Sequence, residues 1–316
     1  MQTRTYGELF KLIRSLAGVG SFSTAELDDI ANLINRRFLT IFNESPIWPR
    51  YLVSSEKRDV LALTLSGATA STDTTVNQNY KLLGSNTTGG SNVYQGATTN
   101  TVIIYNTGTA WRVDTAASAA EQTDGTFTVT SGTQQFIEAD TNKKDNITEV
   151  ETFTPRDGTD SLLVEGKNLV PYAQSGKTTI GSFNRIYRKK PFLNQSALEY
   201  EFFVDVTGAN ILNIASTTDN SVFVTYKQQF SPFTVTGTDA EDFTDSTVEV
   251  PGEFFSYLAH ATYADFLRMD GQTDKAFQEE ERANVAMALE LEKIDIISNN
   301  NTVNKRFSTY VNRQSR

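Results

Sequence analysis

The stretch from residue 22 to residue 46, FSTAELDDIANLINRRFLTIFNESP, predicts the first long helix of the chain. Ser23 and Glu26 match a capping box, in which a hydroxyl and a carboxylate bond the free backbone N–H groups at a helix start. Phe22 and Leu27 lie where a hydrophobic staple would fix the entry angle. Pro46 ends the pattern, because proline cannot continue a helix. Between these signals runs an apolar stripe at helical spacing, formed by Leu27, Ile30, Leu33, Ile34, Phe38, Ile41 and Phe42. A stripe of this width must be buried against another element.

Apolar residues at the same helical spacing occur before this stretch and near the C-terminal end of the chain. A shorter helix is predicted from Tyr6 to Ala17, ended by Gly18. Pro251 suits the first turn of a third helix, which Gly271 interrupts. One face of this third helix carries Phe254, Phe255, Leu258, Thr262, Phe266 and Leu267. The next helix is predicted over residues 274–297, and its outer side, with Glu279, Glu281, Arg282, Glu290 and Lys293, is predicted to be solvated.

Between about Val60 and Val250 the period changes to short alternating runs separated by Gly, Asn, Asp and Ser. The clearest run is Leu198–Val206, in which alternate apolar residues would share one face of a strand. Residues 66–150 are richer in small polar residues, yet aromatic residues recur through them, which is unusual for disordered segments. We interpret that segment as an inserted β module.

These patterns predict an α+β fold, in which N- and C-terminal helices form a helical bundle and flank a central antiparallel β region. The predicted segments are 1–58 for the N-terminal helices, 59–183 for a β module with an accessory insertion at about 66–150, and 184–250 for a further β region. The C-terminal helices follow at 251–297, and a basic tail occupies 298–316.

Composition excludes several classes of protein. The chain has 316 residues and no cysteine, which removes thiol catalysis, zinc ribbons, iron–sulfur ligation and disulfide scaffolds. A single histidine, His260, excludes multi-histidine metal sites and is predicted to be a helix-contact residue. The net charge of −10 should repel nucleic acid rather than attract it. We therefore expect no metal and no cofactor.

No motif predicts an enzyme. Ser175–Thr179 resembles part of a phosphate-binding loop, but Pro171 stands where the leading glycine is required, so the string predicts an ordinary turn. Glu279, Glu280 and Glu281 are consecutive, and therefore fan around a helix rather than converge as a catalytic pair. We expect no catalytic residues.

Membrane association is also not predicted. The longest apolar runs, such as Val102–Tyr105, are far shorter than the about 20 residues that a spanning helix needs. The N-terminus has no apolar segment of the secretory type, so the chain is expected to be made and kept in a cytoplasm.

Two features leave alternatives open. Trp111 could contact a glycan, or could anchor the core of the inserted module, and the core role is favoured. The tail from Ser298 to Arg316 carries four basic and no acidic residues. Its basic residues could contact phosphates, its mixed basic and apolar character suits docking on a protein groove, or it could be a solvated terminus.

Several stretches near the two ends resemble those of tailed-bacteriophage head–tail connector (adaptor) proteins. At the N-terminal end they are Tyr6–Leu9, Glu26–Leu33 continuing through Asn35, Arg36 and Arg37, and Ser45–Tyr51. At the C-terminal end they are Phe254–Ala259, Tyr263–Gln272, and Lys275 with Ala276. The similarity covers residues 1–60 and 184–297, whereas residues 66–150 depart from it and look like an accessory insertion.

The resemblance implies a structural subunit of the virion neck, assembled in the host cytoplasm. It implies a homo-oligomeric ring of roughly twelve copies under the portal protein, with interfaces that close. The ring would join the portal to tail or nozzle proteins and leave a channel through which genomic DNA passes without sequence-specific binding. The negative charge of the protein outside its basic tail is consistent with a channel wall that should not bind DNA phosphates.

The resemblance also implies two sets of contact residues. Portal docking is expected of the tail, through Lys305, Arg306, Phe307, Tyr310, Arg313 and Arg316. Packing between helices of neighbouring subunits is expected of Phe254, Phe255, Leu258, Phe266 and Leu267. The alternative function is a virion surface protein that binds a receptor or glycan, with residues 66–150 as its functional part.

Overall fold

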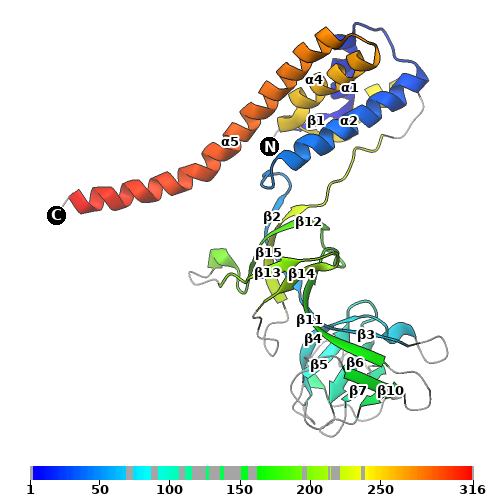
Figure 1. Cartoon of the computed structure of the whole chain (residues 1–316), viewed down its shortest axis with the longest axis vertical. Helices are drawn as coiled ribbons and strands as arrows, with labels where there is room; N and C mark the ends of the chain where they lie inside the picture. The colour runs from blue at the N-terminus through cyan, green and yellow to red at the C-terminus, as the bar shows by residue number, and fades with distance from the viewer. Residues whose placement is uncertain are drawn as a thin grey trace. The chain divides into compact units, whose positions relative to one another are not determined.

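A computed structural model of the chain has the expected α+β fold, with helices from both ends and antiparallel sheets between them (Figure 1). It describes residues 3–68, 74–86, 92–106, 111–115, 126–127, 136–138, 151–155, 162–193, 198–212, 214, 221–235 and 239–314. The chain divides into two compact units. Unit 1 comprises Met1–Leu52 and Gln229–Arg316, and unit 2 comprises Val53–Gln228.

Unit 1 holds the predicted helices. Its elements are β1 (Thr3–Thr5), α1 (Tyr6–Ala17), α2 (Thr24–Glu44), α3 (Ala240–Thr244), β16 (Glu249–Pro251), α4 (Gly252–Met269) and α5 (Thr273–Gln314). The predicted cap of α2 is confirmed, because the backbone N–H of Ser23 donates to Glu26 Oε2 over 2.7 Å. β1 and β16, the strands directly before α1 and α4, pair antiparallel and so bring the two ends of the chain together. Residues from the two ends of the chain thus form one bundle.

The bundle packs around one apolar core. Trp48 is buried, and its indole N–H donates to the Ile41 carbonyl oxygen over 3.0 Å. Phe233, from the segment that returns to the bundle, stacks on Phe38 at 4.3 Å between ring centroids. Gly7 is required where α1 meets α3, since a Cβ there would lie 2.3 Å from the Thr244 carbonyl oxygen. The closeness of that approach fixes the position of α1.

The last helix is longer than the sequence predicts. α5 runs without a break from Thr273 to Gln314, whereas a helix end near Ile297 is expected from the polar run Asn299–Asn301. Asparagine lowers helix propensity by only a few tenths of a kcal/mol relative to most residues, so three of them need not end a helix. The predicted tail is therefore a helical continuation of α5 as far as Gln314.

The described residues of unit 2 form two sheets, which are antiparallel apart from one pairing. The larger has the order β10-β9-β7-β6-β5-β4-β3-β11-β14-β13, and the smaller has the order β12-β15-β2. The strands are β2 (Leu52–Asp59), β3 (Leu61–Ser66), β4 (Asn79–Asn86), β5 (Asn92–Gly96), β6 (Val102–Asn106), β7 (Trp111–Thr115), β8 (Thr126–Phe127), β9 (Phe136–Glu138), β10 (Glu151–Pro155), β11 (Leu162–Pro171), β12 (Ile180–Tyr187), β13 (Phe202–Val204), β14 (Gly208–Ile211) and β15 (Ser221–Gln228). β8 pairs β4 in parallel, away from the main order.

The sheets do not follow the predicted segment boundaries. β12 runs across residues 183 and 184, and β11 pairs both β3 and β14. Strands from 59–183 and 184–250 therefore share one sheet, because long β11 reaches partners at both of its ends. The predicted turn at Ser175–Thr179 is confirmed, since the Lys177 N–H donates to the Gln174 carbonyl oxygen over 3.0 Å.

The run Leu198–Val206 is not the single strand that its alternation predicts. Its first part pairs with the end of β12, through Tyr187 and Glu199, and only β13 pairs with β14. Tyr200 is buried, whereas Leu198 is 56% exposed and Val206, in the turn after β13, is 96% exposed. The alternation is present in the sequence, but the chain changes sheets midway and buries only part of the apolar face.

Candidate interaction surfaces

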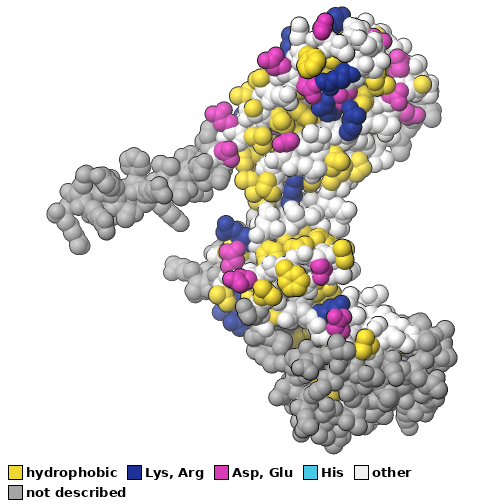
Figure 2. Space-filling view, in the orientation of Figure 1, with side chains coloured by type: hydrophobic (Ala, Val, Ile, Leu, Met, Phe, Trp, Pro, Cys, Tyr) yellow, Lys and Arg dark blue, Asp and Glu magenta, His cyan; other side chains and the backbone are white. Residues whose placement is uncertain are grey.

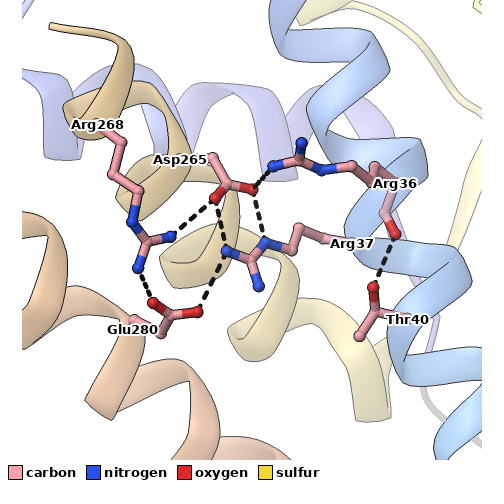
Figure 3. Close-up of polar contacts among 6 residues, drawn as sticks. All are labelled: Arg36, Arg37, Thr40, Asp265, Arg268 and Glu280. Atoms are coloured by element: carbon pink, nitrogen blue, oxygen red, sulfur yellow. Dashed lines mark hydrogen bonds and ion pairs between the residues drawn. The ribbon is translucent and has the colours of Figure 1, made fainter.

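A network of charged side chains joins three helices of unit 1 (Figure 3). Arg37 of α2 contacts Asp265 of α4 with two nitrogens, each at 2.6 Å from a carboxylate oxygen. Arg268 donates to the same carboxylate over 3.0 Å and also contacts Glu280 of α5. Arg36 completes the network, because its Nη2 donates to Asp265 Oδ2 over 2.7 Å. The network binds α2, α4 and α5 together, and its carboxylate oxygens are already occupied, so we assign it a structural role.

Acidification is expected to destabilise unit 1 through this network. Burial raises the pKa of the Asp265 carboxyl, but hydrogen bonds and charge from Arg37 and Arg36 outweigh burial and hold that pKa below its ordinary value. An aspartate titrates near about 3.9 when unfolded, so the stabilisation is present above that pH and is lost as the pH falls through the folded value. The urea concentration at the midpoint of unfolding should therefore be lower at about pH 3 than at about pH 7. An equal fall in Asp265→Asn would contradict the assignment.

His260 is a helix-contact residue, as the sequence predicts. Its Nδ1 lies 2.7 Å from Glu279 Oε2, and Arg282 donates to the other carboxylate oxygen over 2.6 Å. This geometry corrects the expectation that Glu279 belongs to a solvated face, because its side chain is buried against α4. The sequence offered a signal for it, since Glu279 follows Ala276 and precedes Ala283 on the buried side of α5.

The residues expected to pack between subunits lie instead in the core of the chain itself. Phe254, Leu258 and Leu267 are at most 3% exposed, and Phe255 and Phe266 are partly buried against the same core. The prediction is wrong for the three buried residues, because α1, α2 and α5 of one chain already cover that face of α4. A partner subunit cannot reach side chains that their own chain encloses.

The residues expected to dock on the portal lie on α5 or beyond it. Lys305, Arg306, Phe307, Tyr310 and Arg313 belong to the helical backbone of α5, and their side chains fall outside the described part of the structure. Arg316 also lies outside the described residues. Their docking role stays a prediction.

Trp111 lies inside the β module. It is 1% exposed and shares a core with Tyr80, Ile104 and Val164 from neighbouring strands. The ring of Tyr94 lies 6.2 Å away. This placement fits the core role, and leaves little of the indole surface for stacking on a sugar.

The outer face of α5 is a surface that the sequence analysis missed. Three large apolar side chains stand exposed on it: Phe277 is 69%, Val285 56% and Leu289 54% exposed. In Figure 2, hydrophobic and acidic side chains lie along the described part of α5. A signal was present for Val285 and Leu289, which fall opposite the buried Ala276, Ala283 and Ile294 at helical spacing, whereas Phe277 follows Ala276 directly and gave no such signal.

A second exposed surface follows β12. Arg188, Lys189 and Lys190 are consecutive and exposed. Leu193 is 81% exposed after a short 3-10 turn, and the exposed Leu198 accepts a hydrogen bond from the Arg188 N–H over 2.9 Å. Figure 2 shows Lys and Arg side chains beside hydrophobic ones in this part of the molecule, with Asp and Glu side chains close by. The surface is thus basic and apolar at once.

Unit 1 also contains a small cavity of about 230 Å³. Tyr6, Asn35, Phe233 and Phe243 are among its lining residues, and the buried Tyr6 hydroxyl has no hydrogen-bond partner among the described residues. Asn35 is already used, because its side chain bonds both backbone groups of Phe233. Asp28 and Thr234 also line the cavity beside apolar residues, and this mixed lining does not define a ligand.

Other site types find no support in the part of the chain that the structure describes. No group of three or more acidic or histidine side chains there could hold a metal ion. No helix among those residues is long and apolar enough to cross a membrane. Compared with protein-family models, with curated proteins and with solved structures, the chain matches none of them.

Proposed function

We propose that the chain is a structural head–tail connector subunit of a tailed phage, which forms a ring under the portal and joins it to the tail. The observation that carries the proposal is the contact between the two terminal regions that resemble this class. Trp48 and Tyr51, from the Ser45–Tyr51 stretch, contact Phe254 from the Phe254–Ala259 stretch, with ring centroids 4.7 Å and 6.1 Å apart.

Charged residues of the same stretches also meet. Arg37 contacts Asp265, and Arg50 lies 3.5 Å from Glu253, the residue directly before the Phe254–Ala259 stretch. Stretches more than 200 residues apart in the sequence therefore act as parts of one helical unit. Such joint packing is expected if the resemblance reflects a common fold, because unrelated similarities at two ends of a chain would have no reason to touch.

Surface and charge support a role in assembly. A helix that leaves Phe277, Val285 and Leu289 exposed gains stability by burying them against another protein. The net charge of −10 suits a channel wall that lets DNA phosphates pass. The burial of Trp111 gives the glycan-binding alternative no support, and we do not propose it.

Electron microscopy of the virion tests this function directly. Antibody fragments raised against unit 1 should label the neck, and classified images should show a ring of this chain between portal and tail. Label on the capsid surface, on tail fibres or nowhere on the particle would contradict the proposal.

Removal of Ser298–Arg316 is expected to weaken binding to purified portal rings at least about tenfold. The reason is the concentration of four basic residues without any acidic residue in this segment, whose docking role rests on the resemblance. Binding is measured by co-sedimentation with portal rings. The described contacts of α5 with the core end at Ile294, so the thermal midpoint should be unchanged. Equal binding by the truncated and full chains would remove the tail from the docking site.

A further inference from the structure

The outer face of α5 has a uniform chemical character between Thr273 and Asp295. At about 100° per residue, the side opposite the core holds the exposed Phe277, Val285 and Leu289. The charged residues on that side are Asp274, Glu281, Glu292 and Asp295, all exposed and all acidic. We call this the acidic–apolar face.

The basic residues of this part of α5 lie beside that face, and two of the three contact acidic side chains, whereas Lys275 donates to the neutral Gln272 side chain over 2.8 Å. Arg282 contacts Glu279 at 2.6 Å, and Lys293 contacts Glu290 at 2.5 Å. The acidic–apolar face therefore keeps its negative charge. A partner for it needs apolar side chains and positive charge together.

The chain itself presents such a surface after β12. We call Lys189, Lys190, Leu193 and Leu198, with Arg188 between them and β12, the basic–apolar surface. The nearest acidic residue in sequence, Glu199, lies 4.0 Å from Arg185 and so offsets that arginine rather than the lysines. Two leucines, 81% and 56% exposed, stand beside at least two exposed ammonium groups.

We infer that the acidic–apolar face of one copy binds the basic–apolar surface of a second copy. The two surfaces are complementary in charge and both expose large apolar side chains, which is the combination that gives a contact both orientation and stability. Each surface lies within one unit, and the contact joins two molecules. It is heterologous, because each copy uses a different surface on each neighbour, and such contacts generate rings or open filaments. The inference rests on the proposed function only in identifying the ring that this contact would build.

The test uses two full-length variants in sedimentation velocity over a range of protein and salt concentrations. The face variant carries Phe277→Gln, Val285→Gln and Leu289→Gln, and the surface variant carries Lys189→Glu and Lys190→Glu. Wild-type chain should assemble in a concentration-dependent way, and assembly should weaken as salt screens the charges. Each variant alone should associate at least about tenfold more weakly than wild type.

Mixing the variants gives the sharpest outcome. The surface variant keeps an intact acidic–apolar face, and the face variant keeps an intact basic–apolar surface, so the mixture should form a one-to-one dimer and nothing larger. Leu39→Gln, which removes an exposed apolar side chain from α2, is the matched control and should assemble like wild type. Circular dichroism should show unchanged helix content in every variant.

Three results would overturn the inference. One is a wild-type chain that stays monomeric at its highest soluble concentration. Another is normal assembly by either variant. The third is a mixture that stays monomeric although both variants have lost self-assembly, since the intact acidic–apolar face of one variant and the intact basic–apolar surface of the other should then have joined. If the variants lose only portal binding, the surfaces belong to the portal contact and the inference also fails. Labelling of the virion neck tests the proposed function separately from all of these results.

Discussion

Asp265→Ala is expected to lower the free energy of unfolding of unit 1 by about 3–5 kcal/mol, because it leaves buried positive charge without its partner. Asp265 is 4% exposed and accepts hydrogen bonds from Arg36, Arg37 and Arg268. The side chain of Arg37 is only 15% exposed, and without Asp265 its remaining charged partner is Glu280 at 3.3 Å. Removing the shared carboxylate therefore breaks the direct charged contact between α2 and α4 and leaves Glu280 of α5 as the acidic partner of Arg37 and Arg268.

The measurement is thermal unfolding followed by far-ultraviolet circular dichroism, which reports on the α-helices, and those described here all lie in unit 1. The midpoint should fall by roughly 10 °C. The matched control is Arg36→Ala. The Arg36 side chain is 62% exposed, so its loss should cost less than about 1 kcal/mol. Equal midpoints for the two variants would show that the network contributes little to stability.

Local rules predicted the helical unit well. The capping box at Ser23 and Glu26, the stripe from Leu27 to Phe42 and the restart at Pro251 each depend on residues within a few turns of one another. Such signals act wherever the segment lies in the fold. For that reason the existence of four long helices, and their union in one bundle, follow from the sequence.

Local rules could not predict which element packs on each apolar helix face. The pattern at Phe254 and Leu258 says that these side chains are buried, but the pattern is the same whether the covering helix belongs to the same chain or to a neighbour. The structure shows α2 and α5 of the same chain in that position. Phe277 follows the buried Ala276 on α5, and only the placement of α5 shows that the Phe277 side chain is exposed.

The β region exposed a second limit. Strand pairing joins residues far apart in the sequence, and the run Leu198–Val206 changes partners from β12 to β14 within nine residues. Alternation records which side chains could share a face, but it does not record which sheet the backbone joins. The exposed Leu198 and Val206 are consequences of that change of partner.

These limits also determine what the candidate surfaces mean. The buried residues first expected to join subunits are needed to hold one chain together, whereas the surfaces on α5 and after β12 are those that we propose to join copies. A subunit of the kind proposed would have to satisfy both demands, because it has to fold before it can assemble. Phe254, which is buried, serves folding, whereas Phe277, which is exposed, would serve assembly.

Phe254→Ala tests that division, and is expected to destabilise unit 1 by about 3–5 kcal/mol. Phe254 is fully buried, and its ring lies within 6.1 Å of those of Phe38, Trp48 and Tyr51, so alanine would leave a large cavity between the two terminal regions. Urea unfolding followed by circular dichroism should show a much lower midpoint.

The control is the same change on the exposed side of the bundle. Phe277→Ala removes an equally large ring from α5, but one that is 69% exposed, so the free energy of unfolding should change by no more than about 0.5 kcal/mol. The same Phe→Ala change is thus expected to lower stability at one position and to weaken association at the other. If Phe277→Ala unfolded unit 1 and Phe254→Ala left it intact, the packing of α4 and α5 described above would be wrong, and with it the contact between Trp48 and Phe254 on which the proposed function depends.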